Sequence, residues 1–346
     1  MLTFIIMNIT LFVVGAVVTL VAVYDIIYTI LSPRGAGFIA DRVSRGIWRF
    51  SLAMVNRNGR KTMLRLIGPV LLLIIVLNWI VLLWIGNTLM VYSDPESLWS
   101  ASRDEFVPGV MENMYFAAYV LSSMGSGDYT PASDWWLFYT GFISYTGVVL
   151  ISLGISFLLP VIEAITLKRQ VSLQIHNLGK NPRQILERYE NDDFVELLER
   201  LKELEPLLLQ LAQYHLAYPV IHYFHSVHLY ESLPVKLVSL DETMSVLLYK
   251  VDSEKIEDIR SLERAYAAMT YYLSTLASAF IQPKDDEPER PDTTYLQNAS
   301  EVTSSRGTGH DKDLEKRRKL LLAYLQNDGW NWRDMEEAED TIELDF

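Results

Sequence analysis

The sequence predicts an all-α membrane protein with three transmembrane helices, a re-entrant pore loop and a cytoplasmic α-helical domain. Half of the 346 residues are hydrophobic although the net charge is −13, which indicates an apolar part joined to a polar part. A helix needs about 20 apolar residues to cross the hydrocarbon core of a bilayer. Three stretches without a charged side chain are long enough, at residues 1–24, 66–93 and 135–162.

The first transmembrane helix is expected over residues 1–32. A cleaved signal peptide is the alternative, but it would carry basic residues ahead of its apolar core and a small-x-small cleavage site behind it. The sequence has neither feature around residues 1–24. We therefore expect a helix that is retained.

Charge in the loops predicts the orientation of the chain in a plasma or inner membrane. Residues 33–65 carry eight basic residues and one acidic residue, whereas residues 93–134 carry seven acidic residues and one basic residue. Positively charged short loops mark the cytoplasmic side, and Lys168 and Arg169 follow the third apolar stretch. We expect the N-terminus outside and everything after residue 168 in the cytoplasm.

The basic linker at residues 33–65 has an amphipathic segment. A basic amphipathic helix tends to lie flat against anionic lipid headgroups, so membrane lipids are the expected partner of this linker; a solvated connector is the alternative. Near-helical spacing relates the apolar Phe38, Ile39, Val43, Ile47, Phe50 and Met54, and another face carries Arg42, Arg45 and Arg49.

The outer loop contains an apolar segment that is too short to span. Every residue from 114 to 121 is apolar or aromatic, and a helix of about ten residues rises only about 15 Å. Gly125 and Gly127 follow, and glycine permits left-handed backbone angles that place successive carbonyls on one side. Non-helical backbone at that depth must be buried in protein or line a water-filled path. The segment therefore predicts a re-entrant pore loop, whose carbonyls replace the hydration shell of a cation.

This segment resembles the filter of the potassium-channel pore family, in which Thr-x-Gly-Tyr-Gly-Asp follows a short pore helix. The six matching positions are Ser123, Met124, Gly125, Ser126, Gly127 and Asp128, and Ser122 directly before them is counted with the predicted ion-conducting filter. Both glycines and the aspartate agree, and Ser123 replaces the threonine. The aromatic pair of the family's pore helix falls on Tyr115 and Phe116, and its hinge glycine falls on Gly147.

The resemblance covers residues 66–168 and implies a pore module. Its parts are an outer helix at 66–93, a pore helix and filter at 112–131 and an inner helix at 135–168. One chain supplies one loop and has no internal repeat, so the implied assembly is a homotetramer. It would conduct monovalent cations passively, with K⁺ as the expected permeant ion and no cofactor.

The sequence departs from the family where an aromatic residue normally braces the filter. Ser126 stands between the two glycines instead, and Met124 replaces the usual valine or isoleucine. Serine fills too little volume to make that contact. Two alternatives therefore stay open: a weakly selective monovalent cation channel, and a non-conducting membrane sensor or scaffold with a pore-like fold.

Candidate gating residues lie in the inner helix. Glycine within a helix costs about 1 kcal/mol relative to alanine, and proline removes a backbone hydrogen bond. Gly147 is predicted to be a hinge, whereas Gly154 and Pro160 fit close packing or a static kink better. Asp25, at the inner end of the first helix, is expected at the membrane interface rather than buried.

Residues 169–282 are predicted to form an α-helical domain. Leucines recur at spacings of three and four, and Pro206, Pro219 and Pro234 are expected to separate helices. His222, His225 and His228 follow one another at intervals of three residues. On a helix this spacing points the side chains in different directions, which favours core or surface positions over a metal or proton sensor. Residues 283–312 have a disordered composition, and residues 313–346 are expected to form a helix and an acidic tail.

Enzymatic function is not expected. The sequence has no paired carboxylates, nucleophile–base pair or metal-ligand cluster in a recognisable pattern, and it has no cysteine, which excludes thiol chemistry and Cys-ligated zinc. No nucleic-acid partner is expected either. The gating stimulus and the role of the helical domain stay open.

Overall fold

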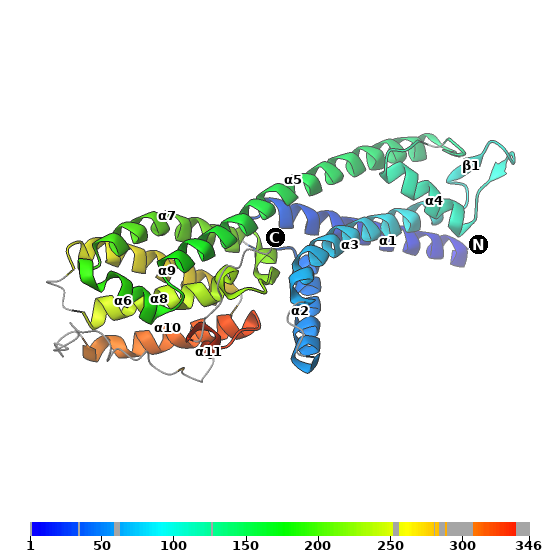
Figure 1. Cartoon of the computed structure of the whole chain (residues 1–346). Coiled ribbons are helices and arrows are strands. Elements are labelled where there is room, and N and C mark those ends of the chain that lie inside the picture. The colour runs from blue at the N-terminus through cyan, green and yellow to red at the C-terminus, as the bar shows by residue number, and fades with distance from the viewer. Residues whose placement is uncertain are drawn as a thin grey trace, which may run out of the picture. The chain divides into compact units, whose positions relative to one another are not determined.

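The structure is a computed structural model of the chain, and it describes residues 2–33, 35–58, 63–125, 127–251, 256–279, 281–283, 288 and 307–336 (Figure 1). The acidic tail, most of the segment expected to be disordered, and Ser126 lie outside these residues. The chain divides into two compact units. The first contains Met1–Arg45 and Val70–Pro160, and the second contains Gly46–Pro69 and Val161–Phe346.

Three helices are long and apolar enough to cross a membrane, which confirms the three expected apolar helices. They are α1 (Leu2–Leu31), α3 (Leu64–Tyr92) and α5 (Asp134–Leu178). The inner helix was expected to end at residue 168, but α5 continues for ten more residues to Leu178, directly before Gly179. A Cβ at Gly179 would lie 2.7 Å from Cγ1 of Ile185, so the chain turns closely there and the helix stops.

Small residues bring α1 and α3 together within the first unit. A Cβ at Gly15 would lie 2.6 Å from the carbonyl oxygen of Gly86, and a Cβ at Gly86 would lie 2.3 Å from Oγ1 of Thr19. Close backbone approach through small residues is the usual way in which helices associate in lipid. Any larger side chain at either glycine would push the two helices apart.

The basic linker contains α2 (Phe38–Asn58), which confirms the expected helix. Its first turn is bonded to Asp25 of α1: one carboxylate oxygen accepts the N–H of Ile39 at 2.8 Å, and the other accepts the N–H of Ala40 at 3.3 Å. The indole of Trp79, on α3, donates to the same carboxylate at 2.8 Å. Asp25 is only 1% exposed, so the expectation that it is not buried was wrong, whereas its position at the membrane interface stays a prediction. The carboxylate is buried because it satisfies the free N–H groups at the start of α2.

Three short strands between α3 and α5 show that the fold is not wholly α-helical. They are β1 (Leu98–Ser100), β2 (Glu105–Phe106) and β3 (Tyr129–Pro131), in the antiparallel order β2-β1-β3. Strands of two or three residues are too short for an alternating pattern to be visible in a sequence. The helix α4 (Val110–Leu121) connects β2 to the segment before β3.

The second unit is built around α8 (Leu233–Tyr249), in which every residue from 233 to 247 is buried. The surrounding helices are α6 (Pro182–Tyr189), α7 (Val195–Ala217), α9 (Ile259–Ala279), α10 (Gly307–Asn327) and α11 (Trp332–Glu336). Hydrophobic side chains of α10 and α11 belong to the same core as those of α7 to α9. The final helix is therefore part of the domain and not an appendage that follows it.

The proline predictions for this unit are partly confirmed. Pro219 begins a short 3₁₀ turn and Pro234 lies in the first turn of α8. Pro206, however, lies inside α7, which continues through it. Leu204 and Leu208 on either side of Pro206 are buried in the core, and this packing holds the helix together although proline removes one backbone hydrogen bond.

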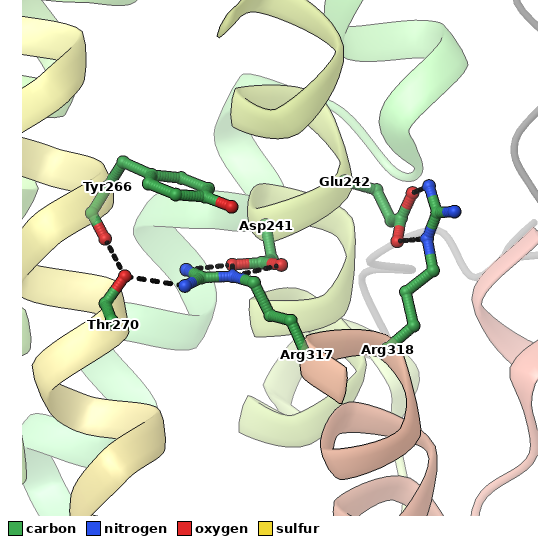
Figure 2. A network of polar contacts seen from close by, with 6 residues as sticks. All are labelled: Asp241, Glu242, Tyr266, Thr270, Arg317 and Arg318. Atoms are coloured by element: carbon green, nitrogen blue, oxygen red, sulfur yellow. Dashed lines mark hydrogen bonds and ion pairs between the residues drawn. The ribbon is translucent and has the colours of Figure 1, made fainter. Parts of the chain in front are cut away.

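Two ion pairs join α10 to the central helix α8 (Figure 2). Nε of Arg317 lies 2.7 and 2.8 Å from the two carboxylate oxygens of Asp241. Nε and Nη2 of Arg318 each lie 2.7 Å from an oxygen of Glu242. Arg317 also donates to the hydroxyl of Thr270 at 2.6 Å. Both carboxylates are buried, so α10 is attached to the core by two bidentate pairs.

Candidate functional site

The helix α4 has 12 residues and rises only about 18 Å. The side-chain amide of Asn113 donates to the carbonyl of Gly109 at 2.7 Å and holds the first turn. The indole of Trp84, on α3, donates to the carbonyl of Met114 at 2.7 Å. Phe116, Tyr119 and further residues of one face are buried. The short helix is therefore packed inside the first unit and is not a solvated loop.

Ser123 ends α4 in a left-handed conformation, with φ 58°. The N–H of Met124 donates to the carbonyl of Tyr119 at 2.9 Å, and the N–H of Ser123 donates to that of Val120 at 3.1 Å. These two bonds form a Schellman motif, the common C-terminal cap of helices. The positive φ at Ser123 is thus explained by helix capping, and its hydroxyl lies 3.3 Å from that of Ser144 on α5.

Residues 122–128, here called the glycine loop, follow the helix. Gly125 has φ 65° and Gly127 has φ 74°, which confirms that both glycines adopt left-handed angles. A Cβ at either position would meet no atom within 4 Å, so backbone conformation, and not crowding within the chain, requires glycine. Asp128 accepts a hydrogen bond from the hydroxyl of Tyr115 at 3.4 Å.

Aromatic side chains surround the end of the glycine loop. The hydroxyl of Tyr119 donates to the carbonyl of Tyr129 at 2.6 Å, and the ring of Tyr115 lies edge-on to those of Tyr119 and Tyr129 at 5.3 and 6.1 Å. The family resemblance pointed to Tyr115 and Phe116 but not to Tyr119 or Tyr129. Tyr119 is four residues after Tyr115, a spacing that places both on one helix face, and this signal could have identified it.

The structure assigns different surroundings to the three gating candidates. A Cβ at Gly147 would lie 2.2 Å from the carbonyl oxygen of Leu121, so close packing of α5 on the end of α4 is sufficient reason for this glycine. A Cβ at Gly154 would meet nothing within 4 Å. Pro160 lies inside α5, which is continuous through all three positions. The hinge role of Gly147 stays a prediction.

The three histidines of the second unit each stack on a different aromatic ring. His222 stacks on Tyr324 at 5.8 Å, His225 on Trp330 at 5.5 Å and His228 on Tyr230 at 5.1 Å. His222 and His225 are buried. Among the residues that the structure describes, no group of three or more His, Asp or Glu side chains is arranged to hold a metal ion.

Burial lowers the pKa of His222 to about 4, and the nearby Lys168 acts in the same direction. As the pH falls below the ordinary histidine value of about 6.5, the unfolded chain binds a proton that the folded chain excludes until about pH 4. We therefore expect His222 by itself to cost the second unit roughly 3 kcal/mol of stability across this interval. Denaturant titrations of the full chain at pH 7.5, 5.5 and 4.5 measure it.

The matched variants are His222→Gln and His228→Gln. Glutamine at 222 keeps a polar group beside Asn327, which contacts His222, but cannot titrate, so the loss on acidification should shrink. His228 is exposed, and its variant should behave as the wild type does. An equal pH dependence in all three proteins would contradict the assignment to His222.

Comparison with known proteins gives one distant relative over the full length. The chain is 26% identical over 336 residues to the uncharacterized membrane protein YdjJ of Bacillus subtilis (strain 168), covering 96% of this chain and 98% of that protein. No protein-family model matches the chain, and no solved structure matches it. The three long apolar helices of the chain agree with the description of this relative as a membrane protein. The chain is a membrane protein with transmembrane helices.

Proposed function

We propose that the chain is the subunit of a homotetrameric channel that conducts potassium ions passively across a plasma or inner membrane. The observation that carries the proposal is the pairing of the strands before and after the glycine loop. Ser100 of β1 pairs with Tyr129 of β3, and Leu98 pairs with Pro131. The intervening chain therefore leaves the sheet and returns to it, between two helices that are each long enough to span a membrane. Such a path fits a re-entrant loop and does not fit a complete crossing.

The glycine loop has the backbone that a cation filter needs. Left-handed angles at Gly125 and Gly127 are compatible with carbonyl groups that face a common axis, where they would replace the hydration shell of an ion. The acidic outer segment 93–134, with Asp128 beside the loop, would raise the local cation concentration at the entrance. In this arrangement the N-terminus is outside, and the second unit and the basic linker lie on the cytoplasmic side, where α2 meets anionic lipid headgroups.

A ring of carbonyls requires several chains, because each chain supplies one glycine loop. Large apolar side chains on the first half of α5 are exposed in the single chain, among them Phe138, Phe142 and Tyr145. Neighbouring subunits and lipid would cover them in the tetramer. Four copies around one axis is the arrangement that the potassium-channel resemblance implies.

Current through reconstituted protein tests the proposal. Purified full-length protein in planar bilayers should pass current whose reversal potential follows the K⁺ gradient more closely than the Na⁺ gradient. Gly125→Ala is the matched control: its Cβ meets no atom of the chain, but alanine at φ 65° is strained, so it should abolish current while the tetramer stays intact. Equal K⁺ and Na⁺ permeability would favour the weakly selective channel. An intact tetramer without current would favour a non-conducting sensor or scaffold.

Ser126→Tyr is expected to raise the K⁺ preference. Tyrosine restores the aromatic volume that this position has in the potassium-channel family and that serine lacks. The permeability ratio of K⁺ to Na⁺ should therefore increase in the tyrosine variant, while Ser126→Ala, which adds no volume, should not increase it. A ratio that is the same in the tyrosine variant and the wild type would show that the missing aromatic does not limit selectivity.

A further inference from the structure

Tyr119 is bonded to both ends of the glycine loop. Its carbonyl oxygen accepts the N–H of Met124 at 2.9 Å and the hydroxyl of Ser122 at 3.1 Å, where the loop begins. Its phenol hydroxyl donates to the carbonyl of Tyr129 at 2.6 Å, directly after the loop ends. The hydroxyl and the backbone carbonyl of Tyr119 thus hold the two ends of residues 122–128 together.

The ring of Tyr119 is itself held firmly. It is 5% exposed and lies edge-on to the rings of Tyr115 and Phe116 at 5.3 and 5.2 Å. It belongs to the core cluster of the first unit, which includes Trp136 and Tyr139 of α5. A phenol anchored in this way has little freedom to follow movements of the loop, so its hydrogen bond fixes the position of the Tyr129 carbonyl.

The second attachment point is also tied to the sheet. Tyr129 begins β3 and pairs with Ser100 of β1, and the preceding Asp128 accepts from the hydroxyl of Tyr115. The end of the loop is therefore bonded to α4 on one side and to β1 on the other. Of the two side-chain bonds from α4, the one from Tyr119 is the shorter, at 2.6 Å against 3.4 Å, and the more buried.

We propose that Tyr119 is the positioning residue that sets the distance between the two ends of the filter in this chain. It takes the place of the aromatic residue that the potassium-channel family has at the position of Ser126. The inference rests on the proposed channel function. Ion discrimination by a ring of carbonyls depends on cavity size and on the number and field of the carbonyl dipoles. Tyr119 controls both ends of the strand that would carry those carbonyls, although it does not itself touch the ion.

Tyr119→Phe tests the proposal because it removes only the hydroxyl and keeps the ring in the core. The matched control is Tyr139→Phe, which removes an equally short phenol bond, to Oδ1 of Asn87 at 2.6 Å, in the same cluster but away from the loop. Amide hydrogen exchange of residues 122–131 in the intact protein should become about tenfold faster in Tyr119→Phe, as expected for one lost, partly buried hydrogen bond. It should stay near the wild-type rate in Tyr139→Phe.

The functional readout is the K⁺ to Na⁺ permeability ratio, which should fall in Tyr119→Phe but not in Tyr139→Phe. Wild-type exchange rates and an unchanged ratio in Tyr119→Phe would overturn the proposal. Faster exchange with an unchanged ratio would also overturn it, because the bond would then stabilise the loop without setting selectivity. Absence of current from the wild type would refute the channel function, whereas wild-type exchange rates in Tyr119→Phe would refute the positioning role of Tyr119 whether or not current flows.

Discussion

Arg318→Met is expected to destabilise the second unit by about 3–5 kcal/mol, because it leaves the carboxylate of Glu242 buried without its partner. Glu242 is 1% exposed, and both of its oxygens accept hydrogen bonds from Arg318. Domains have a total stability of only about 5–15 kcal/mol. The variant should therefore release α10, which pulse proteolysis of the full chain in urea detects as early cleavage of residues 307–336.

The loss in Arg318→Met should depend on pH with a defined sign. Burial raises the pKa of Glu242 from its ordinary value of 4.5, and the bond to Arg318 opposes that rise. Without Arg318 the folded-state pKa rises further, so a protonated, neutral Glu242 is tolerated at low pH. The stability of the variant should then fall as the pH increases above about 4.5.

Two matched controls separate the buried pair from general effects of losing an arginine. The double variant Glu242→Leu with Arg318→Met replaces both partners by apolar groups and should recover most of the stability. Arg183→Met removes an exposed pair to Glu187 and should cost less than about 1 kcal/mol. A single Arg318→Met variant as stable as the wild type would contradict the role of this pair.

Asp25→Leu is expected to destabilise the first unit by at least about 3 kcal/mol. It leaves buried N–H donors without an acceptor, and each unpaired donor costs about 1–3 kcal/mol. These donors are the N–H groups of Ile39 and Ala40 and the indole of Trp79. Thermal unfolding of the protein in detergent micelles measures the loss. An unchanged unfolding temperature would show that the carboxylate does not hold α2.

Three further variants at and near Asp25 should destabilise the first unit by different amounts. Asp25→Asn keeps one acceptor oxygen and should lose less than Asp25→Leu. Thr29→Val removes only the acceptor of the Gly37 N–H, at 2.8 Å, and should lose least. Gly37→Ala should approach the leucine variant, because its Cβ would lie 2.2 Å from a carboxylate oxygen of Asp25. An acid within a membrane helix is by default a candidate for function; here it has a sufficient structural role.

Much of the fold could be read from patterns that are local in the chain. The three apolar helices follow from uninterrupted apolar runs, and α2 follows from the near-helical spacing of Phe38 to Met54. The left-handed angles at Gly125 and Gly127 were predicted because glycine adopts them freely. Helical propensity, span length and glycine conformation all depend on residues close together in sequence.

Long-range contacts were inaccessible to that approach, and they decide how the candidate site is held. The pairing of β1 with β3, the bond from Tyr119 to Tyr129 and the burial of Asp25 by the first turn of α2 join residues that no sequence period relates. The continuation of α7 through Pro206 and the docking of α10 on α8 likewise depend on packing. Local propensity specifies which segments form helices. Which distant residues pair is decided by the free-energy cost of burying polar groups without hydrogen-bond partners.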